Sequence, residues 1–214
     1  MYTHSHLESI ILRAYDIIGR ETPIKADCGK LCGAACCKDA EPGAAVGCPA
    51  VDVAGASDAS TASNERSDAE DIANATTAAP PLDRPDSLGM LLFPGEIGLL
   101  SQEPGFRLYK IPFMDGKAWF LVCEGVCDRR MRPLACRIFP LAPRISADGT
   151  VTARPDPRAM PVCPLAGGEF LAPSFRRAVA KTFRMLAREP QIYDFMSKLS
   201  SNLDDFNGLI KLFS

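Results

Sequence analysis

The chain has 214 residues, of which 47% are hydrophobic, and its formal net charge is −2. This length and composition suffice for one sizeable core, built as one domain or as a domain with an appendage. The small net charge gives no general electrostatic reason to expect a nucleic-acid partner. The first 19 residues lack the pattern of a signal peptide, and no uncharged stretch approaches the roughly 18 apolar residues that span a bilayer. We therefore expect a cytoplasmic protein with no membrane span.

Nine cysteines dominate the chemistry of the sequence, and eight of them fall in two groups. The groups are Cys28, Cys32, Cys36 and Cys37, and then Cys123, Cys127, Cys136 and Cys163. Cytosolic thiols are kept reduced, so clustered cysteines there more often hold a metal ion than form disulfides. Thiolates suit zinc and iron–sulfur centres, and Cys-x₂₋₄-Cys spacing brings two sulfurs onto one ion. The pattern predicts a metal-binding protein.

Histidine is scarce. The only two, His4 and His6, lie at the N-terminus, where we expect an exposed, frayed end. Cys/His zinc sites and Cys-His catalytic arrangements are therefore hard to build near the cysteine groups. Most ligands of a bound metal should be sulfur.

The first predicted element is an N-terminal helix. Ser5-His6-Leu7-Glu8 has the form of a capping box, and the apolar residues that follow have helical spacing. They are Leu7, Ile10, Ile11, Ala14, Ile17 and Ile18. Pro23 marks the exit, so residues 1–38 form the N-terminal helix and the first cysteine group.

Residues 39–86 differ from the rest of the chain. They are rich in Ala, Ser, Thr and Asp, contain no aromatic residue, and carry ten acidic side chains against Arg66 and Arg84. Such a stretch buries too little apolar surface to offset the entropy of ordering, so we expect a disordered or loosely helical insertion. Cys48 lies inside this segment. A mobile segment does not preorganise a metal site, so we expect that Cys48 is not a ligand.

Order should resume after residue 86, in a region of short hairpins. Phe106–Phe113 and Lys117–Cys123 are β-rich and flank Met114-Asp115-Gly116, which predicts a hairpin. A second is expected across Arg144–Ile145 and Val151–Ala153. A proline-started helical turn is expected at Pro94 to Leu100. Residues 87–172 would form the second half of the metal-binding domain.

Between the hairpins, residues 132–140 predict a short helix that fixes Cys136. Pro133 suits its first turn and Pro140 ends it. A divalent ion with four thiolates carries a charge of −2, which is costly to bury without partners. Arg132 and Arg137 could donate hydrogen bonds to the sulfurs and offset that charge.

Residues 173–214 predict a helical C-terminal cap. Phe175, Val179, Phe183 and Leu186 form one stripe of a helix over Pro173 to Glu189. The other side is basic, with Arg176, Arg177, Lys181, Arg184 and Arg188. This side is either a solvent face or a docking face for an acidic partner, such as a protein, or for an anionic surface. A last helix is expected from Gln191 to about Leu203.

Two features of the spacing bear on the type of centre. Adjacent side chains such as Cys36 and Cys37 diverge by about 100° on a helix, so they fit one tetrahedral ion badly and suit two centres or a bridge. Eight cysteines are enough for two four-sulfur sites or one polynuclear cluster.

The motif Cys-x₃-Cys-x₃-Cys-Cys, then Cys-x₃-Cys, then Arg-Pro-x-x-Cys-Arg-x-Phe-Pro and a late cysteine, resembles the YkgJ-like cysteine-cluster family. This family is also described as a zinc- or iron-chelating CxxCxxCC domain. Two features depart from the usual form of this family. The first two cysteines are separated by three residues rather than two, and an Ala/Asp-rich insertion follows the double cysteine. The resemblance covers about Cys28–Lys38 and Met90–Leu165, and Arg132–Pro140 is its most specific part. The ligands that it implies are Cys28, Cys32, Cys36, Cys37, Cys123, Cys127, Cys136 and Cys163.

We thus predict a small α+β cysteine-rich metal-binding domain that holds zinc or iron, with an N-terminal helix, short hairpins, a disordered insertion and C-terminal helices. Three functions fit. The metal could be a structural staple in a domain that binds a partner, which we rank first. It could be an iron–sulfur or polynuclear iron redox centre. Modification of a protein or small molecule, suggested by similar cysteine-rich segments in flagellin lysine methylases, ranks last, because the glycine-rich cofactor loop is missing.

Overall fold

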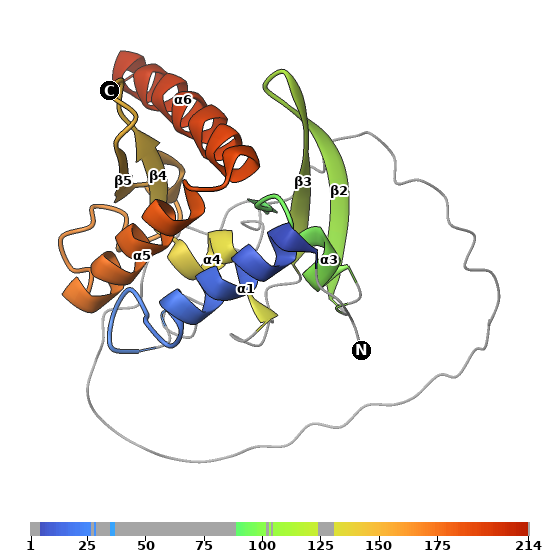
Figure 1. Cartoon of the computed structure of the whole chain (residues 1–214). Helices are drawn as coiled ribbons and strands as arrows, with labels where there is room; N and C mark the ends of the chain where they lie inside the picture. Colours follow the sequence, from blue (N-terminus) through green and yellow to red (C-terminus); the bar gives the residue numbers. More distant parts are fainter. Residues whose placement is uncertain are drawn as a thin grey trace, which may run out of the picture.

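The computed structural model describes residues 5–26, 28, 35–36, 89–101, 103, 105–123 and 131–213, with side chains as far as residue 210. The predicted insertion at 39–86 and Cys48 lie outside the described residues. The described part is a mixed α+β structure with an N-terminal helix, two small antiparallel sheets and C-terminal helices (Figure 1).

The N-terminal helix α1 spans His6–Ile18 and begins as predicted. The Ser5 hydroxyl accepts from the Glu8 backbone N–H at 3.2 Å, and the Glu8 carboxylate accepts from the Ser5 N–H at 2.9 Å. This reciprocal pair satisfies two backbone donors that the first turn of a helix leaves without partners. The helix buries Ile11, Ala14 and Ile18. The capping box and the apolar stripe are therefore confirmed.

The first sheet contains the predicted hairpin and a third strand that was not predicted. Strands β2 (Phe106–Phe113) and β3 (Gly116–Cys123) pair antiparallel, with Phe106 opposite Cys123 and Phe113 opposite Gly116. The turn is therefore the residue pair Met114-Asp115, and Gly116 belongs to the strand. Strand β1 (Met90–Leu91) adds to the other edge of β3. The short helix α3 (Ile97–Leu100) follows, and it starts three residues after Pro94.

The second sheet is the hairpin of β4 (Leu141–Ile145) and β5 (Val151–Pro155), which is longer than predicted. The Asp148 carboxylate accepts from the backbone N–H and the hydroxyl of Thr150, which fixes the turn. The 3₁₀ turn η2 (Pro157–Ala159) follows β5 directly. Before β4 lies the predicted short helix α4 (Leu134–Ile138); Pro133 is its N-cap, one residue before the first turn in which it was expected.

The two C-terminal helices are α5 (Pro173–Leu186) and α6 (Pro190–Phe213). The predicted end of the last helix near Leu203 is wrong, because α6 continues for ten more residues. Nothing in residues 204–213 stops a helix, since Gly208 is the only strong breaker and one glycine costs only about 1 kcal/mol.

One hydrophobic core joins the helices to the second sheet. It contains Ile11 of α1, Leu134 of α4, Leu141 of β4, Phe183 of α5 and Met196 of α6, all of them buried. Helix α1 lies beside α5 and α4, and α6 packs on β4 (Figure 1). The N-terminal helix and the predicted C-terminal cap thus share one core with α4, the helix that carries Cys136.

Candidate metal centre

The structure describes five of the eight predicted ligands, and all five are half-buried. They are Cys28, Cys36, Cys123, Cys136 and Cys163. Cys32, Cys37 and Cys127 lie outside the described residues. Within the described ranges, no three Cys, His, Asp or Glu side chains are grouped closely enough to hold a metal ion. The described residues alone therefore do not assemble the predicted centre.

Cys123 and Cys163 are held by different local structures. Cys123 ends β3 and packs against a small apolar cluster that contains Leu92, Leu100 and Leu121. Cys163 follows η2, and its backbone N–H donates to the Ala159 carbonyl at 2.8 Å. Both cysteines lie at the end of a hydrogen-bonded element, so both sulfurs start from fixed backbone positions.

A buried carboxylate supports the segment that leads to Cys163. The Asp156 side chain is only 4% exposed and forms a two-pronged pair with Arg158, with Nε–Oδ1 at 3.0 Å and Nη2–Oδ2 at 2.7 Å. Its Oδ1 also accepts from the Arg158 backbone N–H at 2.9 Å. These bonds cap η2. Because both carboxylate oxygens of Asp156 already accept hydrogen bonds from Arg158, we do not expect Asp156 to be a metal ligand.

Cys136 lies in the middle of α4, which has only five residues. The basic residue after it, Arg137, donates from Nε to the Arg132 carbonyl at 2.7 Å. The Arg137 guanidinium also lies over the Tyr15 ring of α1, with 4.0 Å between the guanidinium carbon and the ring centroid. The arginine that was predicted to serve the sulfurs thus also joins α4 to α1 through a cation–π contact.

Glu96 is the most unusual side chain near Cys136, because it is a carboxyl group with 0% exposure. Its Oε1 accepts from the Tyr15 hydroxyl at 2.7 Å and from the Leu134 backbone N–H at 2.5 Å. Its Oε2 accepts from the Phe93 backbone N–H at 2.7 Å. Three donors from three separate segments therefore meet at one carboxyl group.

The electrostatics of this group follow from its burial. Burial raises the pKa of Glu96 above its usual value, while the three hydrogen bonds and Arg137 act in the opposite direction. Burial, and then the charge of Glu96, raise the pKa of Tyr15 as well. Cys136 makes a smaller contribution to the raised pKa of Tyr15 in the same direction. The Tyr15 hydroxyl therefore stays protonated and donates.

Sequence reasoning missed both Glu96 and Tyr15. A weak signal existed for Glu96, which is the only charged residue between Met90 and Leu100 in an otherwise apolar and glycine-containing run. Tyr15 gave no signal, because a tyrosine beside the apolar stripe of a helix is ordinary. Their pairing spans 81 residues of sequence and appears only in the fold.

Two buried carboxyl groups and one histidine in the described part of the chain have partners within the protein. The buried carboxyl groups nearby, Glu96 and Asp156, already bind protein donors. His6 lies on the surface, where its Nε2 is 3.0 Å from Glu189 Oε2.

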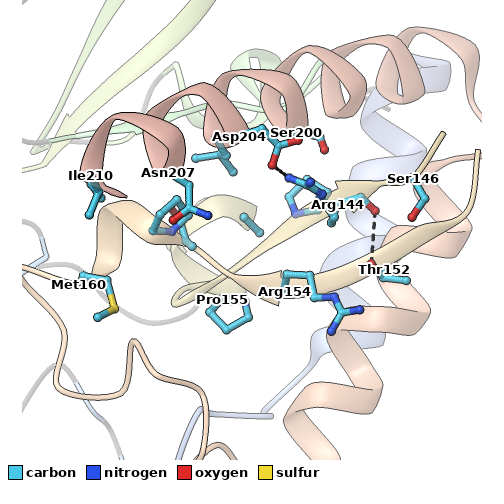
Figure 2. Close-up of a pocket in the computed structure, with 15 residues that line it drawn as sticks. Arg144, Ser146, Thr152, Arg154, Pro155, Met160, Ser200, Asp204, Asn207 and Ile210 are labelled. Atoms are coloured by element: carbon cyan, nitrogen blue, oxygen red, sulfur yellow. Dashed lines mark hydrogen bonds and ion pairs between the residues drawn. The ribbon is translucent and has the colours of Figure 1, made fainter. Parts of the chain in front are cut away.

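A separate pocket of about 620 Å³ lies between the β4–β5 hairpin and α6, and no predicted ligand lines it. Figure 2 shows the Arg144 side chain reaching from β4 to Asp204 on α6, with which it forms an ion pair. Ser200 Oγ on the same helix accepts from the Ile145 backbone N–H at 3.1 Å. Much of the polar lining is thus used to hold α6 on the hairpin, whereas ligand pockets present converging polar groups to the ligand.

Across the described ranges, no helix is long and apolar enough to cross a bilayer. No protein-family model, curated protein or solved structure matches this chain.

Proposed function

We propose that the chain binds zinc or iron through its clustered cysteine thiolates, and that the metal mainly stabilises the fold. The observation that carries this proposal is the grouping of eight of nine cysteines in a chain with only two histidines. The proposed ligands are the eight cysteines of the two groups. Arg132 and Arg137 would offset the charge of the bound thiolates. The proposal agrees with the resemblance to the YkgJ-like family.

The size of the described elements supports a structural role. Helix α4 has five residues and η2 has three, so the segments that carry Cys136 and Cys163 have few backbone bonds of their own, whereas Cys123 ends the eight-residue strand β3. An ion that joined these segments would add its binding free energy directly to folding. Half-burial of the described cysteines suits a site that shields thiolates from water but still admits a metal ion.

The alternative is an iron–sulfur or polynuclear iron redox centre. It is favoured by the adjacency of Cys36 and Cys37 in the sequence, because neighbouring side chains on a helix or strand point in different directions and so fit one tetrahedral ion badly. Such a centre would make the protein an oxidoreductase or a maturation factor.

Metal analysis and an absorption spectrum of protein purified without air would separate the two roles. About one or two zinc ions per chain with no visible colour would support the structural role, given four ligands per ion. Iron with a brown colour that bleaches on reduction would support the redox centre. Folded protein that takes up neither metal would contradict both.

We also propose that one face of α5 docks an acidic protein segment. Arg177, Lys181 and Arg184 on α5, and Arg188 two residues beyond its end, are all exposed, and we call these four residues the basic stripe. Helix α5 contains no acidic residue. Arg176 lies outside the stripe, because its guanidinium donates to the Gly168 carbonyl.

The distribution of charge supports this partner. Residues 39–86 carry ten of the 26 acidic side chains but two of the 24 basic ones, so the remaining residues have a formal charge of +6. No aromatic residue lies among the residues of the stripe, whereas single-stranded nucleic acid needs stacking platforms. Arginine in particular forms paired hydrogen bonds with carboxylates.

A further inference from the structure

The network around Glu96 joins three segments that are far apart in the sequence. Tyr15 belongs to α1, Phe93 follows β1, and Leu134 is the first residue of α4. Burying a carboxyl group costs desolvation free energy, and a protein with well-packed apolar residues in its place is often as stable or more stable. Burial energy alone therefore does not explain why a carboxyl group occupies this position. Hydrogen bonds differ from apolar contacts in that they fix one orientation.

The element that this network orients most directly is α4. A five-residue helix has about one turn, and its own hydrogen bonds do not outweigh the cost of nucleation. Contacts from outside therefore decide where it points. The Leu134 N–H binds Glu96 at the start of the helix, and the Arg137 guanidinium lies on the Tyr15 ring near its end. Cys136 lies between these two contacts.

The same contacts relate α4 to α1, the helix that leads toward the first cysteine group. Tyr15 takes part in both of them, through its hydroxyl on Glu96 and through its ring under Arg137. Glu96 itself accepts three hydrogen bonds within the protein and is not needed as a ligand.

We propose that Glu96 and Tyr15 are positioning residues that hold Cys136 in the orientation required to bind metal together with the other cysteines. This inference rests on the proposed metal-binding function. Residues that orient ligands typically change metal affinity by about 10–100-fold when they are removed, although they never touch the ion.

The test uses Tyr15→Phe, which keeps the ring under Arg137 and removes only the hydroxyl that binds Glu96. Co²⁺ is the probe, because its thiolate charge-transfer and visible bands report both ligand type and geometry. We expect Tyr15→Phe to bind Co²⁺ roughly 10–100-fold more weakly in competition with a chelator, with altered visible bands. Glu96→Gln should behave in the same way and serves as the second variant if Tyr15→Phe does not fold.

Two controls separate positioning from general loss of stability. Tyr109→Phe removes the hydroxyl of a half-buried tyrosine on β2 and should leave Co²⁺ binding unchanged. Ile192→Val removes one methylene from the buried face of α6 and should lower the denaturant midpoint without changing the Co²⁺ bands. Wild-type affinity and bands in Tyr15→Phe and Glu96→Gln would overturn the inference, as would an equal effect of Ile192→Val. Wild-type protein that binds no Co²⁺, zinc or iron would instead contradict the proposed function, and the positioning role with it.

Discussion

Glu96 shows how the chemistry of one residue depends on its surroundings. In water its carboxyl group would ionise near the usual value of 4.5, but here it has no contact with solvent. The groups that face it are the Tyr15 hydroxyl from α1, the Arg137 guanidinium from α4, and two backbone N–H groups. Their hydrogen bonds offset part of the cost of burial, but the pKa of Glu96 remains raised.

The raised pKa predicts how stability depends on pH. Above pH 4.5 the unfolded chain has lost the Glu96 proton while the folded chain still holds it, so the unfolded state binds fewer protons. The contribution of Glu96 to the free energy of unfolding is therefore greatest below pH 4.5 and falls as pH rises through the folded pKa. Denaturant unfolding of the wild type and of Glu96→Gln over a pH series measures this difference. A free energy of unfolding of the wild type that rises with pH relative to that of Glu96→Gln would show that the sign is wrong.

At the level of elements, the approach of α1 to the segment before α3 depends on Gly95. Its φ is +96°, and a Cβ there would lie 2.9 Å from the backbone carbonyl carbon of Leu7. Backbone in this region is rarely adopted by other residues, and α1 leaves no room for a side chain. Gly95 thus lets the chain turn beneath α1 and bring Glu96 up to Tyr15.

We expect Gly95→Ala to lower the free energy of unfolding by about 1–3 kcal/mol from backbone strain, and further because of the contact with Leu7. Gly105→Ala is the matched control, because Gly105 also has a positive φ, +83°, but has open space around its Cβ position. The free energy of unfolding should fall further in Gly95→Ala than in Gly105→Ala, and the difference measures the cost of the contact with α1. Equal losses in the two variants would show that Leu7 and α1 yield without cost.

Helix α5 makes a prediction about the basic stripe. Replacing Arg177, Lys181, Arg184 and Arg188 with glutamine should weaken binding of poly-L-glutamate by roughly tenfold or more at low salt, since the attraction comes from these charges. The control changes Arg107, Lys110, Lys117 and Arg154 to glutamine, which removes the same charge from exposed positions on β2, β3 and β5.

Binding isotherms for both variants decide between the possibilities. An equal loss in the control would show that overall charge, and not the stripe, determines binding. A stripe-dependent preference for duplex DNA or for anionic vesicles over poly-L-glutamate would overturn the choice of an acidic protein segment as partner.

At the scale of the whole molecule, the sequence predicted those elements that depend on interactions between residues close together in the chain. The capping box at Ser5, the apolar stripe of α5 and the β2–β3 hairpin each depend on residues close together in sequence. Strand β1 depends instead on β3, to which it pairs across about 30 residues, and its two residues carry no signal of their own. The same contrast between local and long-range interactions applies to the candidate site. The cysteines can be read from the sequence, but the Glu96 network cannot, because burial of a carboxyl group depends on donors that only the fold brings together.

The metal-to-protein ratio of the wild type, Cys136→Ser and Cys48→Ser, each purified without air, tests the central claim most directly. We expect the wild type and Cys48→Ser to hold about the same amount of zinc or iron, since Cys48 lies apart from both cysteine groups. Cys136→Ser should lose metal and cooperative unfolding together, because a structural site contributes its binding free energy to folding. A wild-type protein that is folded and free of metal, or a Cys136→Ser variant that retains both its metal and its stability, would contradict the account.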